Sequence, residues 1–341
     1  MARWRSLLWF VVRRCLVAVP LLVGATLVTF FLVRIGDANP AVLIAGPLAD
    51  QESVRAIEHE LNLDRPVIVQ YGLYLRDLVS GDLGTSWESN RPVVTEIAKR
   101  LPATLELVVL GMAASVVFGV LVGFIAAVRR NGWVDHVLRV LTLGGISMPI
   151  FWIGLLLIYL FAFKLGWLPP PVGRLGLRDA RPDTITGFLL LDSLLQGNWK
   201  ALWAAASHLI LPVLTIVAVA GSTIAKQARS SLVEVLESDY VRYARAMGLP
   251  RRKVWGMALH LVTPTIITFV ALTFGFVIGG SALVETIFSW SGLGQAGIRA
   301  IVAVDFAVVQ GYVLVLAIIS VLVYLIADVV VGVLDPRTMK R

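Results

Sequence analysis

Six long stretches of this chain are almost free of charged residues, and they constrain its fold more than any other feature. They cover residues 15–33, 107–128, 140–163, 209–225, 261–284 and 306–327. An α-helix needs about 20 apolar residues to cross the hydrocarbon core of a bilayer, which is about 30 Å thick. Of the 341 residues, 58% are hydrophobic and 15% are charged, which excludes a soluble domain with an ordinary surface. The sequence therefore predicts an all-α polytopic membrane protein with six transmembrane helices.

The distribution of charge predicts which loops lie in the cytoplasm. If the N-terminus is cytoplasmic, the segments 1–14, 129–139, 226–260 and 333–341 share that side and hold 17 basic and 5 acidic residues. The segments on the other side hold 13 basic and 15 acidic residues. Cytoplasmic loops of membrane proteins carry an excess of Lys and Arg. We therefore expect both termini to be cytoplasmic, and the formal charge of +8 needs no nucleic-acid partner.

The polar segments between the spans define the domain organisation. We expect an N-terminal segment with the first span at 1–33, an external cap at 34–102, a core with the other five spans at 103–333, and a cytoplasmic tail at 334–341. The core contains an external insertion at 164–207 and a cytoplasmic loop at 226–260. Within the cap, residues 54–61 and 68–79 have the pattern of short amphipathic helices.

The sequence offers no catalytic, cofactor or metal site. Its four histidines lack metal-ligand spacing, and its single cysteine, Cys15, cannot form an internal disulfide. No Gly-Lys pair is present, so there is no Walker A loop to bind nucleotide phosphates. Glu106 and Asp328 are the ionisable residues expected inside the spans, both near helix ends, which argues against an ion-coupled carrier. A structural or signalling membrane protein remains an alternative.

Small residues and prolines mark places where helices pack closely or break. Gly119 with Gly123, and Gly275 with Gly279, form GxxxG pairs that suit either packing within the chain or a dimer face. Two further groups of small or helix-breaking residues could line a pathway: Ser147, Met148 and Pro149, and Gly279, Gly280 and Ser281. Such residues are also common in membrane helices that line no pathway.

The cytoplasmic loop at 226–260 is the most informative segment. It predicts two short helices, 231–237 and 239–247, the second with Asp239 as its N-cap and Gly248 at its end. Small Ala244 and Ala246 would let this helix fit closely into a partner. Positive charge surrounds it, from Arg242, Arg245, Arg251 and Arg252. A solvated basic loop or a loop that binds lipid headgroups is the alternative interpretation.

Residues 239–249 read DYVRYARAMGL, and this stretch resembles the EAA loop of permease subunits of ABC importers in the dipeptide/oligopeptide/nickel family. Five more stretches are similar to that family and follow its order: 100–107, 147–152, 285–294, 308–311 and 334–337. The insertion around 189–192 is most like that of the B-type dipeptide permeases. Tyr243 and Ser291 depart from the usual small residue and proline, and Arg242 stands where many families have glutamate.

This resemblance implies a type I ABC importer permease fold and a non-catalytic subunit in the cytoplasmic (inner) membrane of a bacterium. The expected function is ATP-driven import of dipeptides or short oligopeptides. The expected partners are a homologous C-type permease, two ABC ATPase subunits that bind ATP and Mg²⁺, an external substrate-binding protein and membrane lipid. We expect coupling to the ATPases through Asp239, Tyr240, Arg242, Ala244, Arg245, Ala246, Gly248 and Leu249. A pathway or gate is expected at Ser147, Met148, Pro149, Gly279, Gly280, Ser281, Glu285, Phe288 and Trp290.

Overall fold

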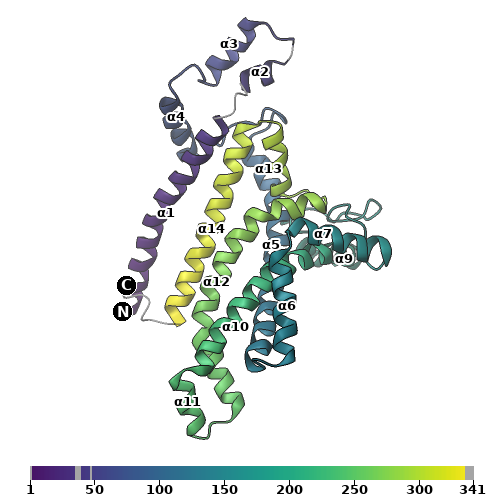
Figure 1. The fold of residues 1–341 in the computed structure, drawn as a ribbon. Helices are drawn as coiled ribbons and strands as arrows, with labels where there is room; N and C mark the ends of the chain where they lie inside the picture. Colours follow the sequence, from purple (N-terminus) through teal and green to yellow (C-terminus); the bar gives the residue numbers. More distant parts are fainter. Residues whose placement is uncertain (1, 35–39, 47, 335–341) are drawn as a thin grey trace.

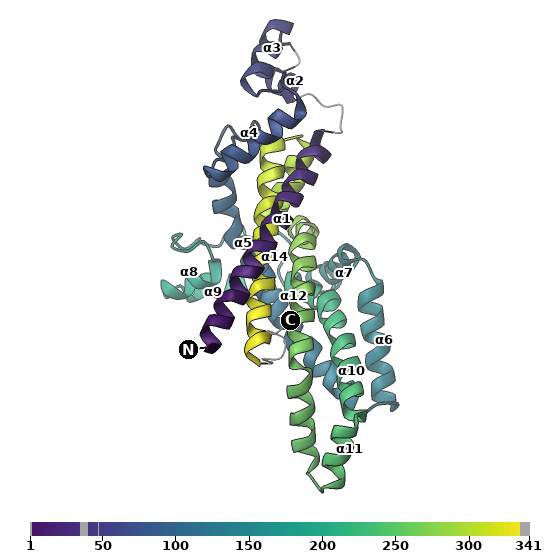
Figure 2. The same ribbon diagram turned by 90° about the vertical axis from the view of Figure 1, so that its left-hand side faces the viewer.

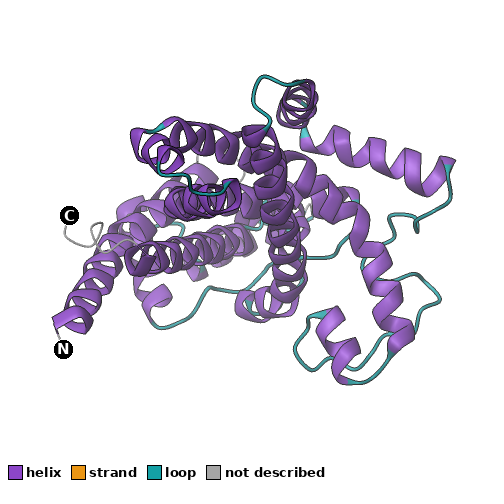
Figure 3. Cartoon of the chain, turned by 90° about the horizontal axis from the view of Figure 1, so that it is seen from below, coloured by secondary structure: helices purple, strands orange, loops and turns teal. Residues whose placement is uncertain are grey.

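The computed structural model describes residues 2–34, 40–46 and 48–334, and within them helices joined by loops make up the fold, with no strand (Figure 1, Figure 3). The first half contains α1 (Ala2–Arg34), α2 (Pro40–Ala45), α3 (Gln51–Glu60), α4 (Val67–Val79), α5 (Val93–Val128), α6 (Trp133–Ser147), α7 (Ile150–Leu157) and the π-helical η1 (Ile158–Lys164). The second half contains α8 (Leu189–Leu195), α9 (Trp199–Ile216), the π-helical η2 (Val217–Gly221), α10 (Ser222–Glu237), α11 (Asp239–Ala246), α12 (Arg251–Ile287), α13 (Leu293–Val302) and α14 (Phe306–Leu334). The predicted all-α class is confirmed.

Five helical segments in the described part of the chain are long and apolar enough to cross a membrane. They are Trp9–Arg34, Val93–Val128, Trp199–Glu237, Arg251–Ile287 and Phe306–Leu334. A sixth span is reached when α6 is counted together with α7 and η1, which meet at an angle of 107°. The predicted tail lies outside the described residues apart from Leu334.

The expected third span, 140–163, is interrupted at Pro149, one of the prolines that the sequence marks as a possible helix break. Helix α6 ends at Ser147, Met148 adopts an extended conformation (φ −89°, ψ 136°), and α7 begins directly after Pro149. The ring of a proline disfavours helical geometry in the residue before it, and proline has no N–H to continue the helix. The third span is therefore a bent pair rather than a rod.

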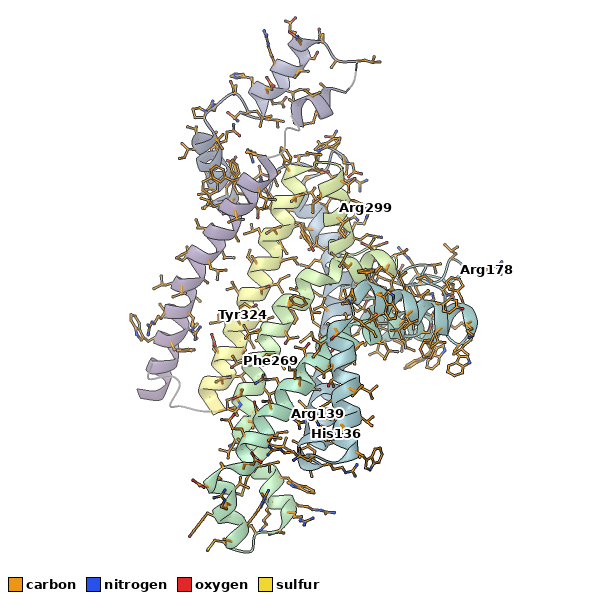
Figure 4. The ribbon with its side chains drawn as sticks, in the orientation of Figure 1. His136, Arg139, Arg178, Phe269, Arg299 and Tyr324 are labelled. Atoms are coloured by element: carbon orange, nitrogen blue, oxygen red, sulfur yellow. The ribbon has the colours of Figure 1, made fainter. Side chains whose placement is uncertain are left out.

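Glycines bring α5 into close contact with α10. A Cβ atom at Gly119 would lie 2.7 Å from the Cβ of Ile224, and one at Gly123 would lie 2.8 Å from the Cβ of Ala228. A Cβ at Gly275 would collide with the hydroxyl of Tyr324 on α14, a residue labelled in Figure 4. At these three glycines the GxxxG pairs serve packing within the chain, which was one of the two interpretations that the sequence left open.

The cap contains α2, α3 and α4, and the two amphipathic helices predicted there are present. Asp50 caps α3 by accepting a hydrogen bond from the backbone N–H of Ser53 at 3.0 Å. On α4, the Tyr71 hydroxyl donates to the carbonyl oxygen of Val23 in α1 at 3.2 Å, and the Tyr71 ring meets Phe30 edge-on at 5.1 Å. These contacts fix α4 against the end of the first span. The boundary expected at residue 102 falls inside α5, which begins at Val93.

The cap and the loop at 226–260 lie at opposite ends of the molecule (Figure 1, Figure 2). The first residues of α1 and the last of α14 point away from the cap in both views. An ion pair of 2.9 Å between Arg14 and Asp328 joins these two helices. The starting residues of α1 and the last residues of α14 are therefore joined on the side of the molecule away from the cap.

Replacing Gly123 by alanine tests the close packing of α5. The added methyl group would meet the carbonyl oxygen of Ala225 and the side chain of Ala228 at 2.8 Å, and such overpacking costs about 1–3 kcal/mol of stability. We expect a lower thermal unfolding midpoint for the purified protein in detergent. Gly256→Ala is the matched control, because nothing lies within 4 Å of a Cβ at that position in α12. An equal loss in both variants would contradict the packing role.

Candidate functional site

The short helix α11 begins at a cap that differs from the one predicted. Ser238 is the N-cap: it has an extended conformation (φ −64°, ψ 153°), and its side chain accepts a hydrogen bond from the backbone N–H of Val241. Asp239, expected as the cap, is the first helical residue instead. Serine and aspartate are both good N-caps. Ser238 is the cap here because its backbone is extended, whereas Asp239 is already helical. The carboxylate of Asp239 still lies in the first turn, where negative charge is favourable.

A glycine in the left-handed conformation ends α11. Gly248 has φ +77°, a region that side chains rarely adopt. The N–H of Gly248 donates to the carbonyl of Arg245 at 3.0 Å, and the N–H of Leu249 donates to the carbonyl of Ala244 at 3.2 Å. These two bonds close the helix end. Nothing within the chain lies within 4 Å of a Cβ placed on Gly248, so the position is open to a partner.

The faces of α11 have distinct chemistry. Val241 and Ala244 are buried against the neighbouring helices α10 and α12. Tyr240, Tyr243 and Met247 are 59%, 68% and 64% exposed, and their spacing of three and four residues places them on one face. The exposed arginines Arg242 and Arg245 extend from the other side of the helix. The helix therefore presents an apolar stripe and a basic edge to its surroundings.

The expected coupling residues differ in exposure. Asp239, Tyr240, Arg242, Arg245, Ala246 and Gly248 are exposed, and Leu249 is half-buried. Ala244 faces inward and packs within the chain. Tyr243 and Met247 were not among the expected coupling residues, although large apolar residues at this spacing on a charged helix indicate an exposed apolar face.

A buried ion pair anchors α10, from which α11 extends. The guanidinium group of Arg229 donates to both carboxylate oxygens of Asp135 at 2.6 and 2.8 Å. Asp135 is fully buried and also accepts from the backbone N–H of Asn131 at 3.0 Å. A further pair joins Arg130 to Glu237 at the end of α10. Bidentate pairs fix geometry as well as supplying energy, so α6 and the turn before it hold α10 in place.

The residues expected at a gate form two separate groups. Ser281, Glu285, Phe288 and Trp290 are all buried. Ser147, Met148, Pro149 and Gly279 are exposed, and Gly280 is partly exposed. Nothing lies within 4 Å of a Cβ at Gly279 or Gly280. The first group packs inside the chain, whereas the second lies on open surface.

Glu285 is the centre of the buried group. Its carboxylate accepts a 2.6 Å hydrogen bond from the Thr104 hydroxyl of α5 and a 2.9 Å bond from the backbone N–H of Gln295 in α13. The Thr104 oxygen also accepts from the backbone N–H of Leu293 at 2.8 Å. The Trp290 indole donates to the carbonyl of Ala103 at 3.0 Å. We call this cluster the outer lock, because it ties the end of α12 and the start of α13 to α5.

Glu285 directly follows the apolar stretch 261–284 and is still helical, because α12 continues to Ile287. Glu106 is more enclosed than expected: it is 5% exposed and pairs with Arg174 of the insertion at 2.5 Å. Each carboxylate is therefore held by groups on another segment.

The external insertion is folded around Asp192. The carboxylate of this buried residue accepts hydrogen bonds from the hydroxyl and backbone N–H of Thr186, at 2.6 and 2.8 Å, and from the N–H of Gly187 at 3.0 Å. Burial would raise the pKa of Asp192, but these hydrogen bonds favour the charged form and bring the pKa below its usual range. Among the residues that the structure describes, no three His, Cys, Asp or Glu side chains gather as a metal site.

Two family models match the chain. The model described as the inner membrane component of binding-protein-dependent transport systems covers residues 119–340, and the N-terminal model of the same membrane components covers residues 7–108. The chain belongs to this family. The permease is therefore a multi-pass, non-catalytic component of the inner membrane, and it works with a binding protein and with the ATPase subunits of an ABC importer.

Relatives and a solved structure agree with this assignment. The permease is 40% identical over 332 residues to the dipeptide transport system permease protein DppB of Alkalihalophilus pseudofirmus, covering 97% of this chain and 99% of the relative. It is 40% identical over 334 residues to the probable D,D-dipeptide transport system permease protein DdpB of Escherichia coli K12, covering 96% and 97%. The inward-facing MetNI methionine ABC transporter is similar in fold, with a TM-score of 0.54 at 17% identity, covering 71% of the permease and 97% of that chain. The type I permease fold is thus confirmed.

Thr104→Val tests the outer lock. The substitution keeps the shape of the side chain but removes the hydroxyl that serves both Glu285 and the backbone of Leu293. Leaving buried polar groups without partners costs about 1–3 kcal/mol, so we expect a lower thermal unfolding midpoint. Thr273→Val is the control, because the buried Thr273 hydroxyl bonds only to the carbonyl of Phe269 in its own helix. An unfolding midpoint for Thr104→Val as high as that of the control would contradict a stabilising role for the outer lock.

Proposed function

We propose that this permease imports dipeptides or short oligopeptides across the cytoplasmic membrane. The similarity to DppB and DdpB, which are named as dipeptide and D,D-dipeptide transport permeases, extends over almost the whole chain and supports this substrate class. An external peptide-binding protein delivers the substrate to the side of the cap. Two ABC ATPase subunits bind ATP with Mg²⁺ on the other side and supply the energy.

The geometry of α11 is the observation that carries the coupling mechanism. The helix stands at the far end of the molecule from the cap (Figure 2), and it joins α10 to α12. Its apolar stripe of Tyr240, Tyr243 and Met247 is exposed within this chain. Exposed apolar patches flanked by charge are typical of protein interfaces. We assign α11 as the coupling helix, which inserts into a groove on an ATPase subunit.

A second permease chain completes the pathway. The open surfaces at Ser147–Pro149 and at Gly279 and Gly280 lie outside the packed core of this chain. A homologous C-type permease facing these surfaces would enclose a pathway between the two subunits. ATP-driven approach of the two ATPases would then bring the coupling helices together, as a rigid-body change between two states.

The charge distribution assigns the sides. With α11 and both termini in the cytoplasm, the excess of basic residues lies on the cytoplasmic side, as the positive-inside rule requires. The opposite positions of the cap and α11 in the fold support this orientation (Figure 1). The cap then faces the binding protein.

Gly248→Glu tests the coupling role. The substitution places a charged side chain at the open end of α11, where it would be buried without a partner in the ATPase groove, and such a change costs enough to reduce uptake by more than about tenfold. The measurement is ATP-dependent uptake of a labelled dipeptide by the assembled importer in proteoliposomes.

Gly197→Glu is the matched control for this experiment. Gly197 also follows a helix end, has φ +63°, and would have nothing within 4 Å of an added Cβ. Both variants carry the same backbone cost of about 1–2 kcal/mol for a side chain in the left-handed region. We expect Gly197→Glu to retain uptake. Normal uptake by Gly248→Glu, at equal levels in the membrane, would argue against α11 as the coupling helix.

A further inference from the structure

A cavity of about 240 Å³ lies where the cap meets the ends of two spans. Arg34 at the end of α1, Tyr74 on α4, Trp87 in the segment before α5 and Gln310 on α14 all line it. Figure 2 shows α4 lying across the upper ends of α1 and α14. The cavity is therefore separate from α11 and from the outer lock.

Among the residues that the structure describes, three polar groups around this cavity have no hydrogen-bond partner. The Tyr74 hydroxyl, the Trp87 indole nitrogen and the Gln310 amide nitrogen are buried and unpaired, and Gln310 is only 7% exposed. Buried polar groups in folded proteins are nearly always paired, because an unmade hydrogen bond is costly. The indole and amide nitrogens are donors. Their convergence on one cavity indicates an occupant that carries acceptor oxygens.

The charges around the cavity restrict that occupant further. Arg34 is the basic residue among the described lining residues. Its guanidinium already makes a cation–π contact, 3.6 Å from the centre of the Phe30 ring. Asp77, Asp82 and Asp305 also line the cavity. Asp305 accepts a hydrogen bond from a neighbouring serine hydroxyl at 2.6 Å, and Asp77 pairs with Arg76 at 2.9 Å. Asp82 is exposed and accepts a 2.8 Å hydrogen bond from the backbone N–H of Gly84. The negative balance disfavours a simple anion and favours a ligand with an ammonium group.

We propose that this cavity binds the amino-terminal end of a short peptide. The ammonium group faces Asp82, beside the pair of Asp77 with Arg76, and peptide or carboxylate oxygens accept hydrogen bonds from Trp87, Gln310 and Tyr74. The volume equals that of about eight water molecules in the liquid and lies just below the usual range of about 300–1,000 Å³ for drug-sized ligands, which suits a dipeptide. The choice of a peptide rests on the proposed function. The headgroup of phosphatidylethanolamine has the same combination of ammonium and acceptor oxygens.

Equilibrium binding tests the proposal with the purified importer in phosphatidylcholine nanodiscs, without the binding protein. The probe is labelled L-alanyl-L-alanine, and the variants are Trp87→Phe and Gln310→Leu. Each removes one unpaired donor, so we expect about tenfold weaker binding, the effect of one lost hydrogen bond to a charged or buried acceptor. Neither should lower the thermal unfolding midpoint, since the lost group had no partner in the chain. Trp203→Phe is the matched control, because Trp203 is 79% exposed on α9.

The competitors separate the possible occupants. Acetylation of the peptide's amino group should abolish binding, and glycerophosphoethanolamine should compete poorly. Equal competition by glycerophosphoethanolamine would assign the cavity to a lipid headgroup and overturn the proposal, as would unchanged binding in both donor variants or binding of none of the probes. Dipeptide uptake by the complete wild-type importer is measured in parallel. Uptake without binding at this cavity refutes the inference alone, whereas absence of uptake refutes the proposed function.

Discussion

The close contact between α5 and α10 is the interaction on which the rest of the structure depends. Gly119 and Gly123 allow the two backbones to approach, because lipid supplies no hydrophobic drive between helices and close packing must replace it. Next to this contact, α10 is held by Arg229 and Asp135, and beyond it α10 leads into α11. The position of α11 relative to the membrane core is therefore fixed by packing within the spans.

The long helix α12 connects α11 to the outer lock. Its 37 residues correspond to about 55 Å at the usual helical rise, enough to pass through the bilayer and extend beyond it. One end follows α11, and the other carries Glu285, which is bound to α5 and to the start of α13. A force on α11 thus acts on a rod whose far end is fixed by hydrogen bonds. Two-state motion of such a rod can link events on the two sides of the membrane.

Hydrophobic stretches were enough to predict the spans, because the bilayer imposes one physical requirement on all of them. Their ends were predicted less well. The helices α5 and α12 begin at Val93 and Arg251, well before the apolar stretches, because their extensions lie outside the hydrocarbon core and tolerate polar residues. Pro149 marked a helix break, but the angle of 107° depends on packing partners that the local sequence does not contain.

The candidate site was predictable to a similar degree. The position of α11 followed from its capping residues and terminal glycine, which are local signals. The inward orientation of Ala244 could not be predicted from the sequence, since it depends on how α11 lies against α10 and α12. The partner of Glu285 is Thr104, which is 181 residues away in the chain. A single sequence gives no indication of such a pair, so Glu285 was expected at a pathway or gate from the family resemblance, without its partner.

The ion pairs of the permease argue against an ion-coupled mechanism. In the described part of the chain, three carboxylates in or beside the spans pair with arginines of other segments: the buried Glu106 with Arg174, the buried Asp135 with Arg229, and the partly exposed Asp328 with Arg14. Glu285 is held instead by Thr104 and the backbone of Gln295. A carboxylate that carried protons or sodium would have to leave its partner in each cycle, and breaking a buried pair costs about 3–5 kcal/mol. Pairs of this kind stabilise one arrangement of helices and are poorly suited to ion coupling. In the proposed mechanism, an input through α11 moves the helices while these pairs stay intact.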